Sequence, residues 1–535
     1  MTESSVSGDL PAWPPRDQVP HPNPEEHLSF GEKSKKFESG LPIAGPMESY
    51  KTGIPSIPWQ VYVIGFLMCL IAFFNFGIPR LFLLPLSAFI FLSLISKSLQ
   101  SPLPILVALA AYIPYSKSIA GNMGGAVTGL NYTTALTLIG LISIQTVSKK
   151  RAGNHEFSGA EPVSPFEQFF RRLVIIFCCL GAFSVIHTDI IFSQWTFFTA
   201  ILDYKQWIDP FLIFFIFSYL ISTESEAKIV IATMAITLVF IGLGSIWQHH
   251  VVAGYHHRVR LKGIAGQANQ MGAFYSNYIF ILLGFFTMKG LKLRSRALFA
   301  IGMVGCFLGL MATESRGDAL ALVFAVLAFF FFRNKMLFIA SVGLIAFLAL
   351  NIQFLPQGLR ARVQHTMTTH QEPDGLTRGA RLDGSARTRL ALWAGAIQMM
   401  KEHPFIGVGY NMFHELIYSY VPHNDETAGL PLKRRDAHNA YFLIGAEMGI
   451  PTLLIFILLL LNMLRVTFHA YRASIDPFWK ATSLATMCTV LSLMMTNLFG
   501  SRVISLVLAG YLWGLLAIML KVPAWQKHYH SETVK

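Results

Sequence analysis

The chain has 535 residues, of which 53% are hydrophobic and only 13% are charged. Soluble domains carry about 25% charged residues, so this composition excludes an ordinary soluble protein and predicts an all-α, polytopic membrane protein. The net charge of +13 does not indicate a nucleic-acid partner, because most Lys and Arg residues lie in short connections between apolar runs, where they set membrane topology.

The start of the chain differs in composition from the rest. Residues 1–55 are polar and rich in Pro, Glu and Ser, and the first apolar run begins near Trp59. We therefore expect no cleavable signal peptide and a disordered cytoplasmic tail over residues 1–55. The five cysteines lie inside apolar runs without metal-ligand spacing, so neither a disulfide framework nor a zinc site is expected.

Apolar runs of helix-spanning length then follow one another, which predicts about 12–14 transmembrane helices. The third run is the least regular, because Pro104 and Pro114 interrupt it. The runs lie near residues 59–76, 80–96, 102–116, 131–148, 173–190, 206–222, 228–247, 270–288, 297–313, 318–332, 336–352, 438–464, 480–498 and 503–521.

Basic residues recur in every second connection between these runs, which is typical of cytoplasmic loops. This alternation predicts an even number of helices and places both chain termini in the cytoplasm. Residues 56–352 and 437–522 then form two membrane parts, residues 523–535 a cytoplasmic tail, and the long polar segment 353–436 lies on the outer side. The basic residues concerned are Lys149, Lys150, Arg151, Arg171, Arg172, Lys289, Lys292, Arg294, Arg296, Arg333, Lys335, Arg465 and Arg472.

The outer segment contains a helical pattern of its own. Leu390, Trp393, Ile397 and Met400 recur at helical spacing, and Pro404 ends the pattern. We interpret it as an amphipathic helix that lies on the membrane surface. A connection of about 80 residues with helices of its own is more often functional than a linker.

Several arginines lie on the outer side, against the topology rule. Arg258 and Arg260 precede the run that begins near residue 270, Arg316 lies between two apolar runs, and Arg389 lies in the outer segment. Cations at membrane depth are costly, so these arginines are candidates for binding an anion. The alternative for Arg316 is an ion pair with the carboxylate on either side of it.

His438 closes the outer segment and opens the next apolar run, which places its imidazole at the boundary between water and lipid. Its unperturbed pKa suits proton transfer near neutrality, so it is a candidate catalytic base. The alternative is a histidine that only caps a membrane helix. The pairs His249-His250 and His256-His257 lack a carboxylate at a recognised spacing, and no metal or other cofactor is expected.

Arginines and a base on one face favour a transferase or hydrolase that acts on a phosphorylated lipid. The planar guanidinium donates two hydrogen bonds at once to a diphosphate. It can also neutralise the charge that grows on a leaving diphosphate, in place of a metal. The alternative is a transporter or flippase for a similar anionic lipid, although a sequence repeat of the transporter kind is not seen.

The same residues stand in blocks that resemble a known family. These blocks look like the O-antigen ligase and polymerase superfamily of bacterial inner-membrane glycosyltransferases, and the resemblance covers roughly residues 170–520. The blocks are residues 260–269, 313–317, 389–393, 403–413, 437–441 and 447–451.

The resemblance implies a function and roles for individual residues. It implies a multi-pass enzyme of the bacterial inner membrane that transfers a glycan from undecaprenyl diphosphate to an acceptor hydroxyl on the periplasmic face, without metal or nucleotide. Arg260 and Arg316 would hold the diphosphate, helped by Arg389, with Arg258 as the alternative to Arg260, and His438 would be the essential histidine. The acceptor stays open between another repeat unit (O-antigen or exopolysaccharide), the lipid A core of lipopolysaccharide, and a protein. Other polysaccharide-assembly proteins and membrane lipids are the expected partners.

Overall fold

The computed structural model describes most of the chain from Leu92 onward. All described residues belong to one compact unit, Thr52–Lys535. The predicted tail over residues 1–55, the first predicted span and most of the second lie outside the described residues. The described residues are 92–119, 132–153, 165–192, 197–255, 260–354, 360, 364, 367–371, 377–382, 384–422, 427, 429–500 and 505–533.

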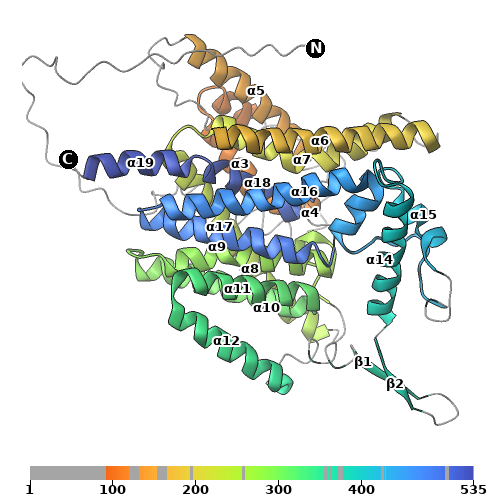
Figure 1. The fold of residues 1–535 in the computed structure, drawn as a ribbon. Helices are drawn as coiled ribbons and strands as arrows, with labels where there is room; N and C mark the ends of the chain where they lie inside the picture. Colours follow the sequence, from red (N-terminus) through yellow and green to blue (C-terminus); the bar gives the residue numbers. More distant parts are fainter. Residues whose placement is uncertain are drawn as a thin grey trace, which may run out of the picture. The chain divides into compact units, whose positions relative to one another are not determined.

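Helices dominate this part of the chain, which confirms the predicted fold class (Figure 1). Every predicted run from the third onward coincides with helix. The helices are α3 (Leu103–Tyr112), η1 (Ile113–Tyr115), α4 (Ser116–Ile119), α5 (Tyr132–Gly153), α6 (Pro165–Phe192), α7 (Phe197–Leu220), α8 (Glu224–Tyr255), η3 (Gly263–Ala265), α9 (Ala268–Thr287), α10 (Leu293–Thr313), α11 (Arg316–Arg333), α12 (Lys335–Leu350), η4 (Ile352–Phe354), α14 (Gly384–Glu402), α15 (Phe413–Tyr420), α16 (Ala440–Ala473), α17 (Pro477–Thr496), α18 (Leu506–Met519) and α19 (Val522–Thr533).

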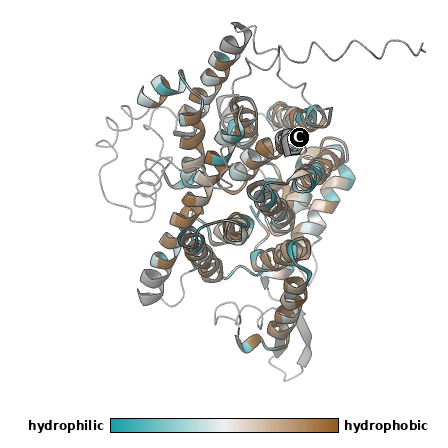
Figure 2. Ribbon diagram, turned by 90° about the vertical axis from the view of Figure 1, so that its left-hand side faces the viewer, coloured by the Kyte–Doolittle hydropathy of each residue, from teal (hydrophilic) through white to brown (hydrophobic). Residues whose placement is uncertain are grey.

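Among the described residues, 6 helices are long and apolar enough to cross a membrane. These are α6, α8, α10, α16, α17 and the segment Leu506–Lys527, and four shorter apolar helices accompany them. Hydrophobic residues, in brown, recur along the helices of the bundle (Figure 2). The described part of the chain is therefore a multi-pass membrane protein. The predicted total of 12–14 helices stays a prediction, because the first run and most of the second are not described.

Helix α9 forms the centre of the helix bundle. It contacts α8, α10, α11, α17 and α18, and most of its residues are buried. The backbones of α8 and α10 touch where Gly242 faces Gly302 and Gly305, since a Cβ on Gly242 would lie only 2.4 Å from the carbonyl oxygen of Gly302. Small residues of this kind let membrane helices approach closely. At the periphery, α12 has no buried residue.

The third predicted run is broken, as its prolines indicated. Helix α3 ends at Tyr112, one tighter turn follows that contains Pro114, and α4 begins at Ser116. Proline lacks the backbone N–H that a continuing helix needs. Lys117 follows this break directly, and α4 contacts η3 in the segment that leads into α9.

The outer segment differs from its prediction in two ways. Besides helices it holds an antiparallel pair of strands, β1 (Met367–Gln371) and β2 (Thr377–Leu382), with Met367 opposite Leu382. The Pro-Asp-Gly sequence between the strands is a turn signal that the helical interpretation overlooked.

The second difference concerns the side of α14 that packs against the rest of the protein, whereas the location of this helix on the membrane surface stays a prediction. Leu390 and Ile397 are 50% and 40% exposed. The buried side chains are instead Leu392, Ala396 and Met399, because α14 packs this side against α15 in a small second core.

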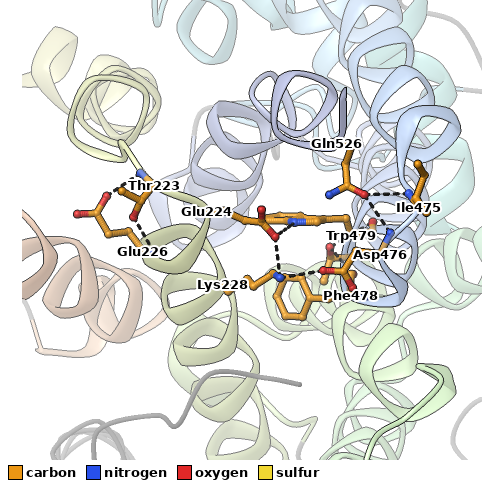
Figure 3. A network of polar contacts seen from close by, with 10 residues as sticks. Thr223, Glu224, Glu226, Lys228, Ile475, Asp476, Phe478, Trp479 and Gln526 are labelled. Carbon is orange, nitrogen blue, oxygen red and sulfur yellow. Dashed lines mark hydrogen bonds and ion pairs between the residues drawn. The ribbon is translucent and has the colours of Figure 1, made fainter. Parts of the chain in front are cut away.

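A polar network links the helices at the end of the bundle where α8 and α17 begin (Figure 3). Lys228 contacts the carboxylates of Glu224 at 2.7 Å and Asp476 at 2.8 Å. Asp476 also caps α17 by accepting from the backbone N–H of Phe478, and the Trp479 indole donates to Glu224. The network joins α8 to the turn between α16 and α17, and it holds the ends of these helices together.

Candidate functional site

Arg260 lies at the junction between α10 and α11. Its Nε donates to the carbonyl oxygen of Thr313 at 2.7 Å, and its Nη2 donates to Oδ1 of Asn269 at 2.5 Å. The backbone N–H of Leu261 donates to the carbonyl of Ala312 at 3.0 Å. The guanidinium is thus held at the carboxyl end of α10, where the helix dipole favours a cation.

Arg316 is the first residue of α11, on the far side of the same junction. Glu314 adopts φ 51° between the two helices, so the chain reverses direction within a few residues. Asp318 in the first turn of α11 is fully buried. A Cβ on Gly272 of α9 would lie 2.5 Å from Oδ2 of Asp318 and 2.9 Å from Oγ1 of Thr313. The start of α9 and the α10–α11 junction therefore form one tightly packed unit that carries both arginines.

His438 precedes α16 in an unusual backbone conformation. Its φ is 50°, which is uncommon for a residue other than glycine and is found most often at functional sites. Its Nδ1 lies 3.8 Å from Oδ2 of Asp436, and its side chain is 39% exposed. The N-cap of α16 is Asn439, which accepts from the N–H groups of Tyr441 and Phe442. His438 is therefore not the residue that caps α16, and its catalytic role stays a prediction.

A turn after α17 links the arginine junction to the histidine. The carbonyl oxygen of Asn497 accepts from the backbone N–H of Ala440 at 2.8 Å. The ring of Phe499 packs against Gly317, where a Cβ would lie 2.5 Å from the ring. Since Gly317 follows Arg316 and Ala440 follows His438 by two positions, one short turn brings both segments together.

Helix α14 adds Arg389 to the same region. The indole Nε1 of Trp393 donates to the carbonyl oxygen of Ala437 at 3.0 Å, next to His438. Arg389 precedes Trp393 by one helical turn and so lies on the same face of α14. Arg258, the alternative to Arg260, lies outside the described residues.

A kink in α16 attaches the outer segment to the bundle. Gly449 has φ 85° inside the helix and Pro451 follows it, so the carbonyls of the preceding turn are free of helical partners. Gly407 packs beside them, and the N–H groups of Val408 and Gly409 donate to the carbonyls of Ala446 and Glu447 at 2.8 and 3.0 Å.

The side chain of Glu447 completes this attachment. It is buried, and its Oε1 accepts from the backbone N–H of Phe413 at 3.1 Å. The sequence motif included Glu447 but gave it no role. A glycine and a proline close together in an apolar helix were the available signal for a kink.

Lys117 is a second residue that the sequence analysis missed. Its Nζ donates to Oε1 of Gln270 in the first turn of α9 at 3.0 Å. Its Cε would lie 3.7 Å from a Cβ on Gly266, within the segment that follows Arg260. Desolvation lowers the pKa of the Lys117 ammonium from its ordinary value. Lys117 follows an apolar run on the predicted outer side, so the rule that singled out Arg260 would have found it.

The side chains of His249 and His250, and all of His256 and His257, lie outside what the structure describes. The expectation that these pairs bind no metal therefore stays a prediction. Among the described residues, groups of three or more His, Cys, Asp or Glu suited to a metal ion are absent.

The fold and the site together define a multi-pass membrane protein that gathers arginines, a lysine and a histidine at one end of its helices. Residues 301–457 match the family model of O-antigen ligase, which confirms the resemblance to the O-antigen ligase superfamily over that segment. The matched segment contains Arg316, Arg389 and His438, whereas Arg260 and Lys117 precede it. No curated protein matches the chain. The family implies a glycosyl-transfer role in polysaccharide assembly.

Proposed function

We propose that the protein transfers a glycan from undecaprenyl diphosphate to an acceptor hydroxyl at the periplasmic face of the bacterial inner membrane. The observation that carries this proposal is the convergence of Arg260, Arg316 and His438. Arg260 bonds to Thr313, Gly317 packs on Phe499, and Ala440 bonds to Asn497. Three segments far apart in sequence therefore present two guanidinium groups and an imidazole at one end of the bundle.

The arginines are suited to bind the diphosphate leaving group of the donor. Their planar groups donate paired hydrogen bonds to phosphate oxygens and neutralise the charge that develops as the diphosphate leaves. Arg260 is held by Thr313 and Asn269, so little side-chain freedom remains to be lost when the donor binds. Arg389 on α14 would contact the donor from the outer segment.

His438 is suited to activate the acceptor hydroxyl. His438 accepts the proton of the acceptor hydroxyl while the acceptor oxygen bonds to the anomeric carbon, and the bond from that carbon to the diphosphate breaks with inversion. The electron pair of the broken bond leaves with the diphosphate. Asp436 lies on the Nδ1 side of the ring, where a carboxylate stabilises the imidazolium that forms.

Glycan transfer from a lipid-linked donor in isolated membranes tests the base. We expect His438→Ala to lower the rate by about 10²–10⁴-fold, the usual contribution of a general base. His414→Ala is the matched control, because His414 is a partly exposed histidine of the same outer segment. Wild-type transfer by His438→Ala would exclude the base role.

The same assay tests the arginines. Arg260→Lys and Arg316→Lys keep the charge but lose the planar fork, and each should cost at least tenfold in kcat/KM for the donor, as expected when a charged hydrogen bond of about 1.5–3 kcal/mol is lost. Arg434→Lys is the control, since Arg434 is 78% exposed. Full activity of both arginine variants would contradict the diphosphate clamp.

The acceptor class is tested in cells. A deletion strain of a polymerase leaves single repeats on the acceptor, a deletion strain of a ligase leaves polymer on the carrier lipid, and a protein O-oligosaccharyltransferase leaves its target protein without glycan. Translocation of the lipid-linked glycan without any transfer would favour the flippase alternative.

A further inference from the structure

An open groove of about 720 Å³ lies at the end of the bundle opposite the candidate site. It is formed where α9 passes into α10 and where α11 passes into α12. Three cationic side chains line it: Lys289, Arg296 and Arg333. None of these residues has a role in the proposed transfer, because α9 and α11 both begin at the site and end at the groove.

The segments that form the groove carry only positively charged side chains. Residues 286–297 contain four basic residues and residues 332–337 contain two, and neither stretch contains Asp or Glu. Two guanidinium groups are held in place by backbone carbonyls, Arg333 by Thr287 at 2.6 Å and Arg296 by Met288 at 2.9 Å. The Nε of Arg296 is buried, and within the described residues it has no hydrogen-bond partner. The groove therefore offers fixed donors to an anion.

The walls beside these cations are apolar and face away from the bundle. Leu293 is 81% exposed and Leu337 is 45% exposed, and both line the groove. Helix α12, which carries Leu337, has no buried residue and packs on α11 (Figure 1). Exposed apolar surface of this kind is expected where a membrane protein meets hydrocarbon, and a water-soluble anion gains nothing from it.

We propose that this groove binds an anionic phospholipid, with the phosphate between Arg296 and Arg333 and an acyl chain along α12. Basic pockets between membrane helices bind anionic headgroups in this way, and each nearby Lys or Arg adds to the attraction. The lipid would fill the space between the α9–α10 turn and α12, and so hold α12 against the bundle. This proposal is independent of the proposed glycan transfer.

Retention of lipid by the purified full-length protein tests the proposal. Native mass spectrometry after exchange into mixtures of phosphatidylglycerol and phosphatidylcholine should show preferential retention of phosphatidylglycerol. We expect Leu337→Glu to weaken that retention by about tenfold or more, because a carboxylate at the groove wall repels the phosphate. The change should not unfold α12, since an acidic residue in the first turn of a helix is favourable.

Met336→Glu is the matched control, because Met336 is the neighbouring residue, is 76% exposed and does not line the groove. It should retain the lipid as the wild type does. Equal retention of both lipids by the wild type, or equal losses in Leu337→Glu and Met336→Glu, would overturn the proposal. A thermal stabilisation by inorganic phosphate that equals that by phosphatidylglycerol would also overturn it, since the site would then recognise a free anion.

Discussion

His438 and Asn439 are neighbours in the sequence but differ in what they do at the start of α16. The asparagine satisfies the first N–H groups of α16, so the histidine next to it is not the residue that caps this helix. The positive φ of His438 is maintained by neighbours on both sides: Trp393 bonds to the carbonyl of Ala437, and Asn497 bonds to Ala440. The geometry of the imidazole is therefore determined by residues that are distant in sequence.

The charge of Lys117 should make donor binding at the proposed site sensitive to pH. Desolvation lowers the pKa of its ammonium, so this lysine loses its charge at a lower pH than an ordinary lysine. We therefore expect the KM for the lipid-linked donor to rise as the pH increases toward the ordinary pKa of lysine, because Lys117 loses its charge before an ordinary lysine does. Lys117→Gln should raise KM about tenfold at neutral pH, as for one lost charged hydrogen bond.

Steady-state kinetics across pH, with Lys117→Arg as the second variant, checks this expectation. Arginine stays protonated at all accessible pH values, so it should flatten the dependence. Lys97→Gln is the control, because Lys97 is exposed and lies before α3, away from the site. An unchanged KM in Lys117→Gln would remove Lys117 from the donor site.

At the scale of elements, the kink in α16 decides where the outer segment attaches. The carbonyls of Ala446 and Glu447 can bind Val408 and Gly409 only because Gly449 and Pro451 interrupt the helix. The chain crosses so closely that a Cβ on Gly449 would lie 2.2 Å from the carbonyl oxygen of Phe405. The kink is thus the anchor of α14 and α15. Because Trp393 of α14 bonds to the residue before His438, the kink also helps to position that histidine.

Gly449→Ala should release this anchor. The new methyl group collides with the backbone at Phe405, and alanine also disfavours the positive φ, so we expect the outer segment to become sensitive to protease and transfer to fall by at least tenfold. Limited proteolysis in detergent, paired with the transfer assay, measures both effects. Gly343→Ala in α12 is the matched control, because nothing lies within 4 Å of its added Cβ. Equal protease resistance of the two variants would contradict this role of the kink.

The two ends of the helix bundle carry different features. One end carries the candidate site, and the other carries the polar network around Lys228 (Figure 3) and the basic groove. Helices α8, α16 and α17 run from one end to the other, so the network at their far ends fixes the frame on which the site is built.

Lys228→Met should destabilise the fold without changing the chemistry. Breaking a buried ion pair costs about 3–5 kcal/mol. Because Lys228 is 19% exposed and Glu224 36% exposed, we expect roughly 1–3 kcal/mol here. The expected result is a lower thermal unfolding temperature in detergent, with unchanged transfer at low temperature. Lys292→Met, which alters an exposed lysine, should leave the unfolding temperature within error of the wild type, and an equal loss in both variants would exclude a special role for the network.

The sequence by itself determined the helices, because lipid forces each spanning segment to satisfy its backbone hydrogen bonds internally, and this leaves a long apolar run in the sequence. It also predicted Arg260, Arg316 and His438 as candidates, since a cation or imidazole on the outer side stands out against such runs. Only the tertiary structure decided how these residues are joined, that Asn439 is the cap, that Leu392 rather than Leu390 faces the core, and that Lys117 contacts Gln270 and Glu447 contacts Phe413. These depend on contacts such as Asn497 with Ala440 and Phe499 with Gly317. Contacts of this kind join residues far apart in the chain, and no local pattern of hydrophobicity or charge encodes them.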